Sequence, residues 1–196
     1  MTVGLLGGAF DPPHSGHVAL AREAITRLDL DCLVIVPTGD PPHKQGETDA
    51  ETRFRLAEAA FADLDGVELS RHELDREGPS YTEDTARWAA EVYGDAVFLV
   101  GADEFCDFLS WHDPDGVLDA ARLAVASRPG FPRERLDAVL AGLRRPDRVE
   151  FFEIEPRPIS SRELRARIAR SEPIDALVPA EVGRLVAELG LYRDAA

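Results

Sequence analysis

Lysine is almost absent from this chain of 196 residues, in which Lys44 is the only lysine among 22 basic residues. Aspartate and glutamate number 37, and the formal net charge of −15 disfavours binding of long nucleic acids, which requires a basic face. A small anionic substrate is compatible with this charge, because a local pocket can be positive on an acidic protein.

Cysteines and long apolar runs are equally scarce. Cys32 and Cys106 are the only cysteines, and without metal or redox spacing they are predicted to be reduced core thiols. The sequence contains no run of eighteen apolar residues, so no membrane-spanning helix is predicted. Residues 1–6 lack the basic start of a signal peptide and predict a buried first strand. We therefore expect one soluble, cytoplasmic domain over residues 1–196, with homo-oligomerisation left open.

Short apolar segments alternate with amphipathic segments along the whole chain. The apolar segments predict strands at residues 3–7, 32–36, 67–69, 96–100, 123–126 and 149–154. The amphipathic segments predict helices at residues 16–28, 51–62, 82–93, 161–169 and 180–189. This alternation is typical of βαβ units, so we expect a Rossmann-like three-layer α/β/α fold with a mostly parallel central sheet. Ligands of such sheets bind at the carboxyl ends of the strands.

The loop from Gly7 to His17 joins the first predicted strand to the first helix. Its glycines let backbone approach a ligand closely, while His14 and His17 are three residues apart and share one face of the helix start. Free N–H groups and the helix dipole favour an anion there, and imidazoles can change charge near neutral pH. We predict phosphate binding. A capping histidine and half of a metal site are alternatives, although no third ligand lies at metal-site spacing.

A second polar segment, residues 158–165, follows the last predicted strand and opens a helix. Ser160 and Glu163 fit a capping box, which is sufficient to explain the serine. Arg162 and Arg165, however, place two cations at the positive end of the helix dipole, where they are unfavourable unless an anion is bound.

Three further segments carry chemistry near predicted strand ends or helix starts. His43 and Lys44 end a Pro-rich loop, and a compact ammonium suits a phosphate; a plain surface loop is the alternative. Thr82 is either a binding residue or a helix N-cap. Asp103 suits ribose hydroxyls, and Trp111 suits stacking on a pyridinium ring, although a tryptophan alone is more often a core residue.

The first loop resembles the signature Gly-Thr-Phe-Asp-Pro-x-His-x-Gly-His of the nucleotidylyltransferase superfamily, with Ala9 in place of the threonine. Residues 159–165 resemble its second signature, Ile-Ser-x-Thr-x-x-Arg, with Arg162 in place of the threonine. The resemblance implies that His14 and His17 are catalytic, bind the ATP phosphates and stabilise the transition state. It implies ATP binding by Gly8, Ala9, Phe10, His14, Gly16, His17, Gly101, Asp103, Ile159, Ser160, Ser161 and Arg165. It also implies that residues 155–196 form a C-terminal helical portion completing the ATP site.

The loop that ends Pro-Pro-His-Lys, the Pro-Ser-Tyr-Thr segment and the Gly-x-Asp followed by a tryptophan resemble the bacterial nicotinate mononucleotide adenylyltransferases. The resemblance implies transfer of an adenylyl group from ATP to nicotinate mononucleotide in NAD biosynthesis, with Mg²⁺ bound through the ATP phosphates and no metal held by the protein. It implies mononucleotide binding by Asp11, His43, Lys44, Tyr81, Thr82, Asp103, Trp111 and His112. The amidated mononucleotide as acceptor and a non-catalytic nucleotide sensor are the alternatives.

Overall fold

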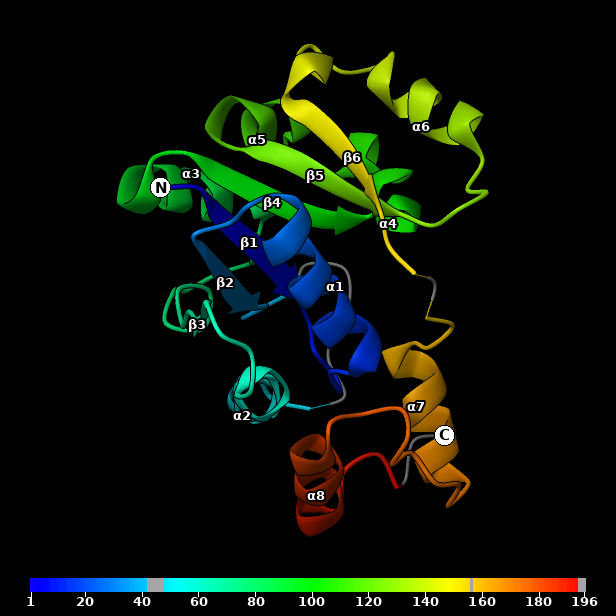
Figure 1. Ribbon diagram of the computed structural model, residues 1–196. Helices are drawn as coiled ribbons and strands as arrows, with labels where there is room; N and C mark the ends of the chain where they lie inside the picture. Colours follow the sequence, from blue (N-terminus) through cyan, green and yellow to red (C-terminus); the bar gives the residue numbers. More distant parts are fainter. Residues whose placement is uncertain (42–47, 156, 194–196) are drawn as a thin grey trace.

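A computed structural model describes residues 1–41, 48–155 and 157–193 of the chain. Six strands form one sheet in the order β3-β2-β1-β4-β5-β6, and every neighbouring pair is parallel. The strands are β1 (Val3–Gly8), β2 (Cys32–Pro37), β3 (Val67–Leu69), β4 (Ala96–Gly101), β5 (Arg122–Ser127) and β6 (Val149–Glu153). The α/β/α fold expected from the sequence is therefore confirmed (Figure 1).

Helices cover both faces of this sheet. They are α1 (Ser15–Arg27), α2 (Ala50–Phe61), α3 (Thr82–Tyr93), α4 (Ala102–Phe105), α5 (Pro114–Ala120), α6 (Arg133–Leu140), α7 (Ser161–Ala169) and α8 (Ala180–Leu189), with 3-10 turns at η1 (Phe108–Ser110) and η2 (Pro146–Arg148). Alternate side chains of a strand enter opposite layers: Leu5 joins the core that contains α3 and α5, whereas Leu6 joins the core that contains α1, α2 and α8. The central strands β1, β2 and β4 carry no charged residue and are largely buried, because helices cover both of their faces, whereas the edge strands β3 and β6 carry exposed glutamates.

Each predicted strand and helix is present, with ends within one residue of the expected ones. The helices α4, α5 and α6 were not predicted. In α5, Asp113 caps the helix by accepting from the N–H of Gly116 at 3.0 Å, and Pro114 follows the cap, so an Asp-Pro start signal was present. In α6 only Leu136 and Val139 are buried, which is too narrow an apolar stripe to recognise by periodicity.

The order of the strands reverses between β1 and β4. The chain proceeds outward from β1 through β2 to β3, and outward from β4 through β5 to β6. Loops that leave β1 and β4 consequently separate at the carboxyl edge, which is where such sheets bind ligands. Helix α8 packs against α2, and both helices lie with α7 toward the end of the molecule at which β1 and β2 finish (Figure 1).

Two smaller expectations concern the cysteines and the membrane. Cys32 and Cys106 are free and half-buried, and both pack against the core on the α3 side of the sheet. No helix within the described ranges is long and apolar enough to cross a membrane.

Candidate functional site

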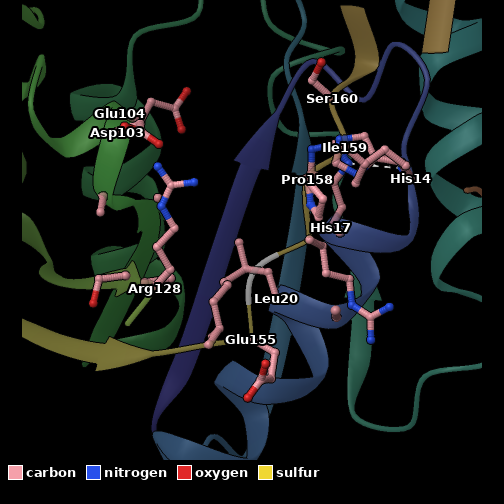
Figure 2. Close-up of a pocket in the computed structure, with 18 of the residues that line it drawn as sticks. His14, His17, Leu20, Asp103, Glu104, Arg128, Glu155, Pro158, Ile159 and Ser160 are labelled. Atoms are coloured by element: carbon pink, nitrogen blue, oxygen red, sulfur yellow. Dashed lines mark hydrogen bonds between the residues drawn. The ribbon is translucent and has the colours of Figure 1, made fainter. Parts of the chain in front are cut away.

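A cavity of about 530 Å³ opens at the carboxyl edge of the sheet. It is lined by residues within 14–20 at the start of α1, by 101–104 at the end of β4, by residues within 126–131 at the end of β5, and by 154–155 and 157–160 after β6. Figure 2 shows His14, His17, Ile159 and Ser160 on one side of the cavity, facing Asp103, Glu104 and Arg128 on the other. Its volume is within the range of small-molecule sites. The switch point of the sheet therefore holds a cavity lined by residues of three predicted ATP-binding segments, together with the segment after β5, which was not predicted.

His14 and His17 form one unit at the start of α1. His14 is the N-cap, with extended backbone at φ −142° and ψ 172°. The two imidazoles stack with their centroids 3.8 Å apart, and the backbone N–H of His14 donates to Nδ1 of His17 at 3.2 Å. Because Nδ1 of His17 accepts this bond, the proton of the neutral ring lies on Nε2. Nδ1 of His14 is buried, and no hydrogen-bond partner for it is present in the described part of the chain.

Burial makes both histidines neutral in the ligand-free protein. It lowers the pKa of His14 to about 4. Burial, together with repulsion from His14, lowers the pKa of His17 to about 3. The charge change near neutral pH that the sequence suggested is therefore absent in the ligand-free protein. A bound anion would favour it, because a nearby negative charge offsets the desolvation of an imidazolium. Before an anion binds, two neutral imidazoles line the cavity, and the proton of His17 is on Nε2.

Gly16 allows the two signature segments to meet. A Cβ at this position would lie 2.9 Å from Nδ1 of His14 and 3.2 Å from Cγ2 of Ile159, so any larger residue would separate the histidine loop from the segment after β6. Phe10 contacts the other histidine of the pair. Its side chain is buried, and its ring packs edge-on against the ring of His17, with the two centroids 5.2 Å apart. Phe10 therefore supports His17 from behind, outside the cavity lining.

The second signature is tied to the first by hydrogen bonds. Ser160 caps α7 by accepting from the N–H of Glu163 at 3.1 Å, as its capping-box spacing predicted. The Ser161 hydroxyl donates to the carbonyl of Pro12 at 2.8 Å, and Arg165 Nη1 donates to the carbonyl of Asp11 at 2.8 Å. The structure thus brings Arg165 to the loop that carries His14. Here the arginine contacts that loop's backbone and lies outside the cavity lining.

The three predicted acceptor segments also meet one another. The N–H of Ser80 donates to the carbonyl of Asp40 at 2.7 Å, and the N–H of Asp40 donates to Oγ of Ser80 at 3.1 Å, which joins the end of β2 to the start of α3. Next to it, the rings of Tyr81 and His112 stack 4.2 Å apart. Trp111 packs edge-on against Phe108 at 5.2 Å.

Several predicted acceptor residues differ from expectation or lie elsewhere. Tyr81 is the N-cap of α3, so the N-cap reading of Thr82 is wrong. Asp103 lines the cavity and is exposed, with Nη1 of Arg135 3.8 Å from its Oδ1. Asp11 is buried, and its Oδ1 accepts from the hydroxyl of Tyr192 at 2.6 Å. His43 and Lys44 lie outside the described residues.

Arg53, Arg128 and Tyr192 contribute to this region and were not predicted from the sequence. Arg128 lines the cavity opposite the histidines (Figure 2), and its position directly after β5 was the available signal. Arg53 is buried on the apolar face of α2. An arginine at a core position of an amphipathic helix is unusual, and that anomaly could have identified it.

The protein offers no metal cage of its own in the ranges that the structure describes, where no group of three or more His, Cys, Asp or Glu side chains could hold an ion. The carboxylates of Asp103, Glu104 and Glu155 line the cavity. This arrangement fits a hydrated Mg²⁺ carried on a polyphosphate, because that ion keeps several waters and needs few protein ligands.

Comparisons with known proteins agree with this geometry. The cytidylyltransferase-like family model matches residues 5–167. A protein of Moorella thermoacetica named "Probable nicotinate-nucleotide adenylyltransferase" is 38% identical over 198 residues, covering 97% of this chain and 91% of the relative. One of the same name from Tropheryma whipplei is 37% identical and covers 96% of this chain and 98% of the relative.

Solved structures share the fold at lower sequence identity. The Plasmodium falciparum nicotinic acid mononucleotide adenylyltransferase complexed with NaAD superimposes with a TM-score of 0.78 at 16% identity, over 97% of each chain.

Proposed function

Because the chain belongs to the cytidylyltransferase-like family, and within it to the nicotinate-nucleotide adenylyltransferases, we propose that it transfers the adenylyl group of ATP to nicotinate mononucleotide. The products are nicotinate adenine dinucleotide and pyrophosphate, in NAD biosynthesis. The observation that carries the proposal is the cavity at the strand switch point, where the histidine pair and the segment after β6 face Asp103. We propose the cytoplasm as its location.

The reaction needs alignment and charge stabilisation more than a strong base. A phosphate oxygen of the mononucleotide attacks the α-phosphorus of ATP in line, a new P–O bond forms, and the bond to pyrophosphate breaks. The attacking phosphate is already anionic, so no nucleophilic serine or cysteine is required. The imidazole of His17 donates a hydrogen bond from Nε2 to the reacting phosphates. Nε2 carries the proton because Nδ1 accepts a hydrogen bond from the backbone N–H of His14. Donors held in this way stabilise charge as it develops in the transition state.

Magnesium belongs to this proposal as an ion bound through the ATP phosphates. When bound, it neutralises part of the polyphosphate charge. Asp103 and Glu104 are the carboxylates of the cavity that would accept hydrogen bonds from its water shell.

We also propose one domain for residues 1–196, in which the C-terminal helical portion from residue 155 completes the ATP site. Support comes from Ile159 and Ser160, which line the cavity, and from Ser161, whose hydroxyl donates to the carbonyl of Pro12. ATP would enter with its base against the apolar lining, such as Leu20 and Ile154, and its phosphates toward the histidines.

Trp111→Ala should raise the KM for nicotinate mononucleotide by roughly tenfold or more, because stacking of an aromatic residue on one base contributes about 1–3 kcal/mol. The KM for ATP should remain close to that of the wild type, since Trp111 lies outside the ATP cavity lining. Steady-state rates with each substrate varied at saturation of the other measure both constants. An unchanged KM for the mononucleotide would remove Trp111 from the acceptor pocket.

The proposed function is tested by mixing the protein with ATP, Mg²⁺ and nicotinate mononucleotide, and measuring pyrophosphate together with the dinucleotide. We expect both products in equal amounts, and a higher kcat/KM for the acid than for nicotinamide mononucleotide. A preference for the amide would correct the acceptor. Binding of ATP without pyrophosphate release would identify a nucleotide sensor instead.

A further inference from the structure

Arg53 is a charged side chain in the interior of the protein, only 2% exposed. Its guanidinium donates to four backbone carbonyls. Nη1 donates to Ala9 at 3.1 Å and Thr38 at 2.5 Å, while Nη2 donates to Gly39 at 3.0 Å. Nε donates to the carbonyl of Thr48 at 3.3 Å. The five N–H groups of a guanidinium have a planar fork geometry, and here that fork joins two loops, the one after β1 and the connection between β2 and α2.

These carbonyls lie at the edge of the sheet where both substrates would meet. Ala9 follows β1 and leads to the histidine loop, and Thr38 and Gly39 follow β2. The two strands are parallel neighbours, with Gly8 opposite Pro37. Arg53 therefore bridges the two loops just beyond the last backbone hydrogen bond between them, which the N–H of Thr38 donates to the carbonyl of Gly8 at 2.9 Å. Past that bond the sheet itself no longer sets their separation.

The loop after β2 has little freedom once it is held in this way. A Cβ at Gly39 would lie 2.1 Å from the carbonyl oxygen of Glu73, so the backbone of the loop is packed directly on another backbone. One residue later, Asp40 exchanges hydrogen bonds with Ser80, beside the Tyr81–His112 stack. A shift of this loop would consequently displace Ser80 and, with it, the neighbouring Tyr81–His112 stack in the proposed acceptor site.

The charge of Arg53 is retained inside the protein. Burial lowers the pKa of the guanidinium, whereas the nearby carboxylates of Asp11 and Asp49 act in the opposite direction. Accepting carbonyls satisfy four of its five N–H donors, and hydrogen bonding of this kind makes a buried charge tolerable. Since the side chain is shielded from solvent, it acts on the loops and does not contact a substrate itself.

We propose that Arg53 is a positioning residue for the acceptor half of the site, holding the loop after β2 at a fixed distance from the histidine loop. The inference rests on the proposed function, because it assigns the β2 loop to the phosphate of the attacking mononucleotide. Residues 37–41 are absent from the lining of the ATP cavity in the described chain. Loss of Arg53 should therefore affect the acceptor far more than ATP.

Arg53→Lys is the test, with Arg55→Lys as its matched control, since Arg55 is an exposed arginine on the same helix. An ammonium keeps the charge but has only three donors and no planar fork. We expect Arg53→Lys to raise the KM for the mononucleotide roughly tenfold or more, with the KM for ATP changed by less than about threefold. Equilibrium binding of the mononucleotide should weaken in parallel. Arg55→Lys should match the wild type in the KM for the mononucleotide, the KM for ATP and the binding of the mononucleotide.

The KM split separates positioning from a merely structural role. If Arg53→Lys only reduces the folded fraction, the maximal rate falls and both KM values stay unchanged. That result would overturn the inference. An equal rise of the KM for the mononucleotide and the KM for ATP would overturn it as well. If Arg53→Lys does not fold, Arg53→Gln is measured in the same way, because its neutral amide leaves no underpartnered buried charge. Failure of both variants to fold would also overturn the inference, since Arg53 would then serve the fold itself. Absence of product with the wild-type protein would instead reject the proposed function.

Discussion

Replacing His17 with alanine should lower turnover by at least about 10²–10³-fold, the usual cost of removing one preorganised donor to a developing oxyanion. The imidazole is held by the N–H of His14 at Nδ1 and by the edge of Phe10, so its Nε2–H is oriented before ATP arrives. Binding of ATP should weaken less than turnover, because the other cavity contacts remain. Pyrophosphate release at saturating substrates measures the effect, and circular dichroism and Tm report the fold.

Two further variants sharpen this result. His17→Gln places an amide N–H near the position of Nε2, so it should recover part of the turnover that alanine loses. His72→Ala is the matched control, because His72 is a half-buried histidine that stacks on Trp88 at 4.2 Å and lies outside the cavity lining. Near wild-type turnover of His17→Ala would remove the proposed role. The same would follow if His72→Ala lost as much turnover as His17→Ala.

Elements with strong periodicity could be predicted from the sequence because burial alone determines them. The continuous apolar run 96–100 is buried on both faces in β4, and the Ala180–Leu189 helix presents Val182, Leu185 and Val186 to the core, at the spacing that a helix requires. The highly charged α6 buries only two side chains, so its helical state depends on tertiary contacts that the local pattern does not contain.

The site shows the same division between local and tertiary information. The His14-x-x-His17 spacing predicts a shared face, and the rings do stack. By contrast, Tyr81 and His112 are 31 positions apart, and no sequence pattern indicates their stacking at 4.2 Å. The carbonyls that Arg53 gathers carry no sequence signal, because every residue has one. The neutral state of the histidine pair is likewise a result of burial, which only the packed loop provides.

Acid should destabilise the ligand-free protein through this histidine pair. Unfolded histidines bind protons near pH 6.5, whereas burial lowers the pKa of His14 to about 4 and that of His17 to about 3. Between about pH 6.5 and 4 the unfolded state therefore binds more protons, and the free energy of unfolding decreases as the pH falls. The slope from these two groups should be about 1.4 kcal/mol per pH unit for each histidine.

The measurement is chemical denaturation from pH 7.5 to 4.5, comparing the wild type with the double variant His14→Gln, His17→Gln. Burial raises the pKa of Glu73, so that carboxyl contributes stability with the opposite sign as the pH falls, but it is present in both proteins and cancels in the difference. If the unfolding free energy of both proteins depended equally on pH, the conclusion that His14 and His17 are neutral in the folded protein would be wrong. ATP should reduce the pH dependence of the unfolding free energy of the wild type. The bound phosphates raise the pKa values of both histidines, so the folded protein also binds protons in this pH range. Without ATP only the unfolded chain binds them.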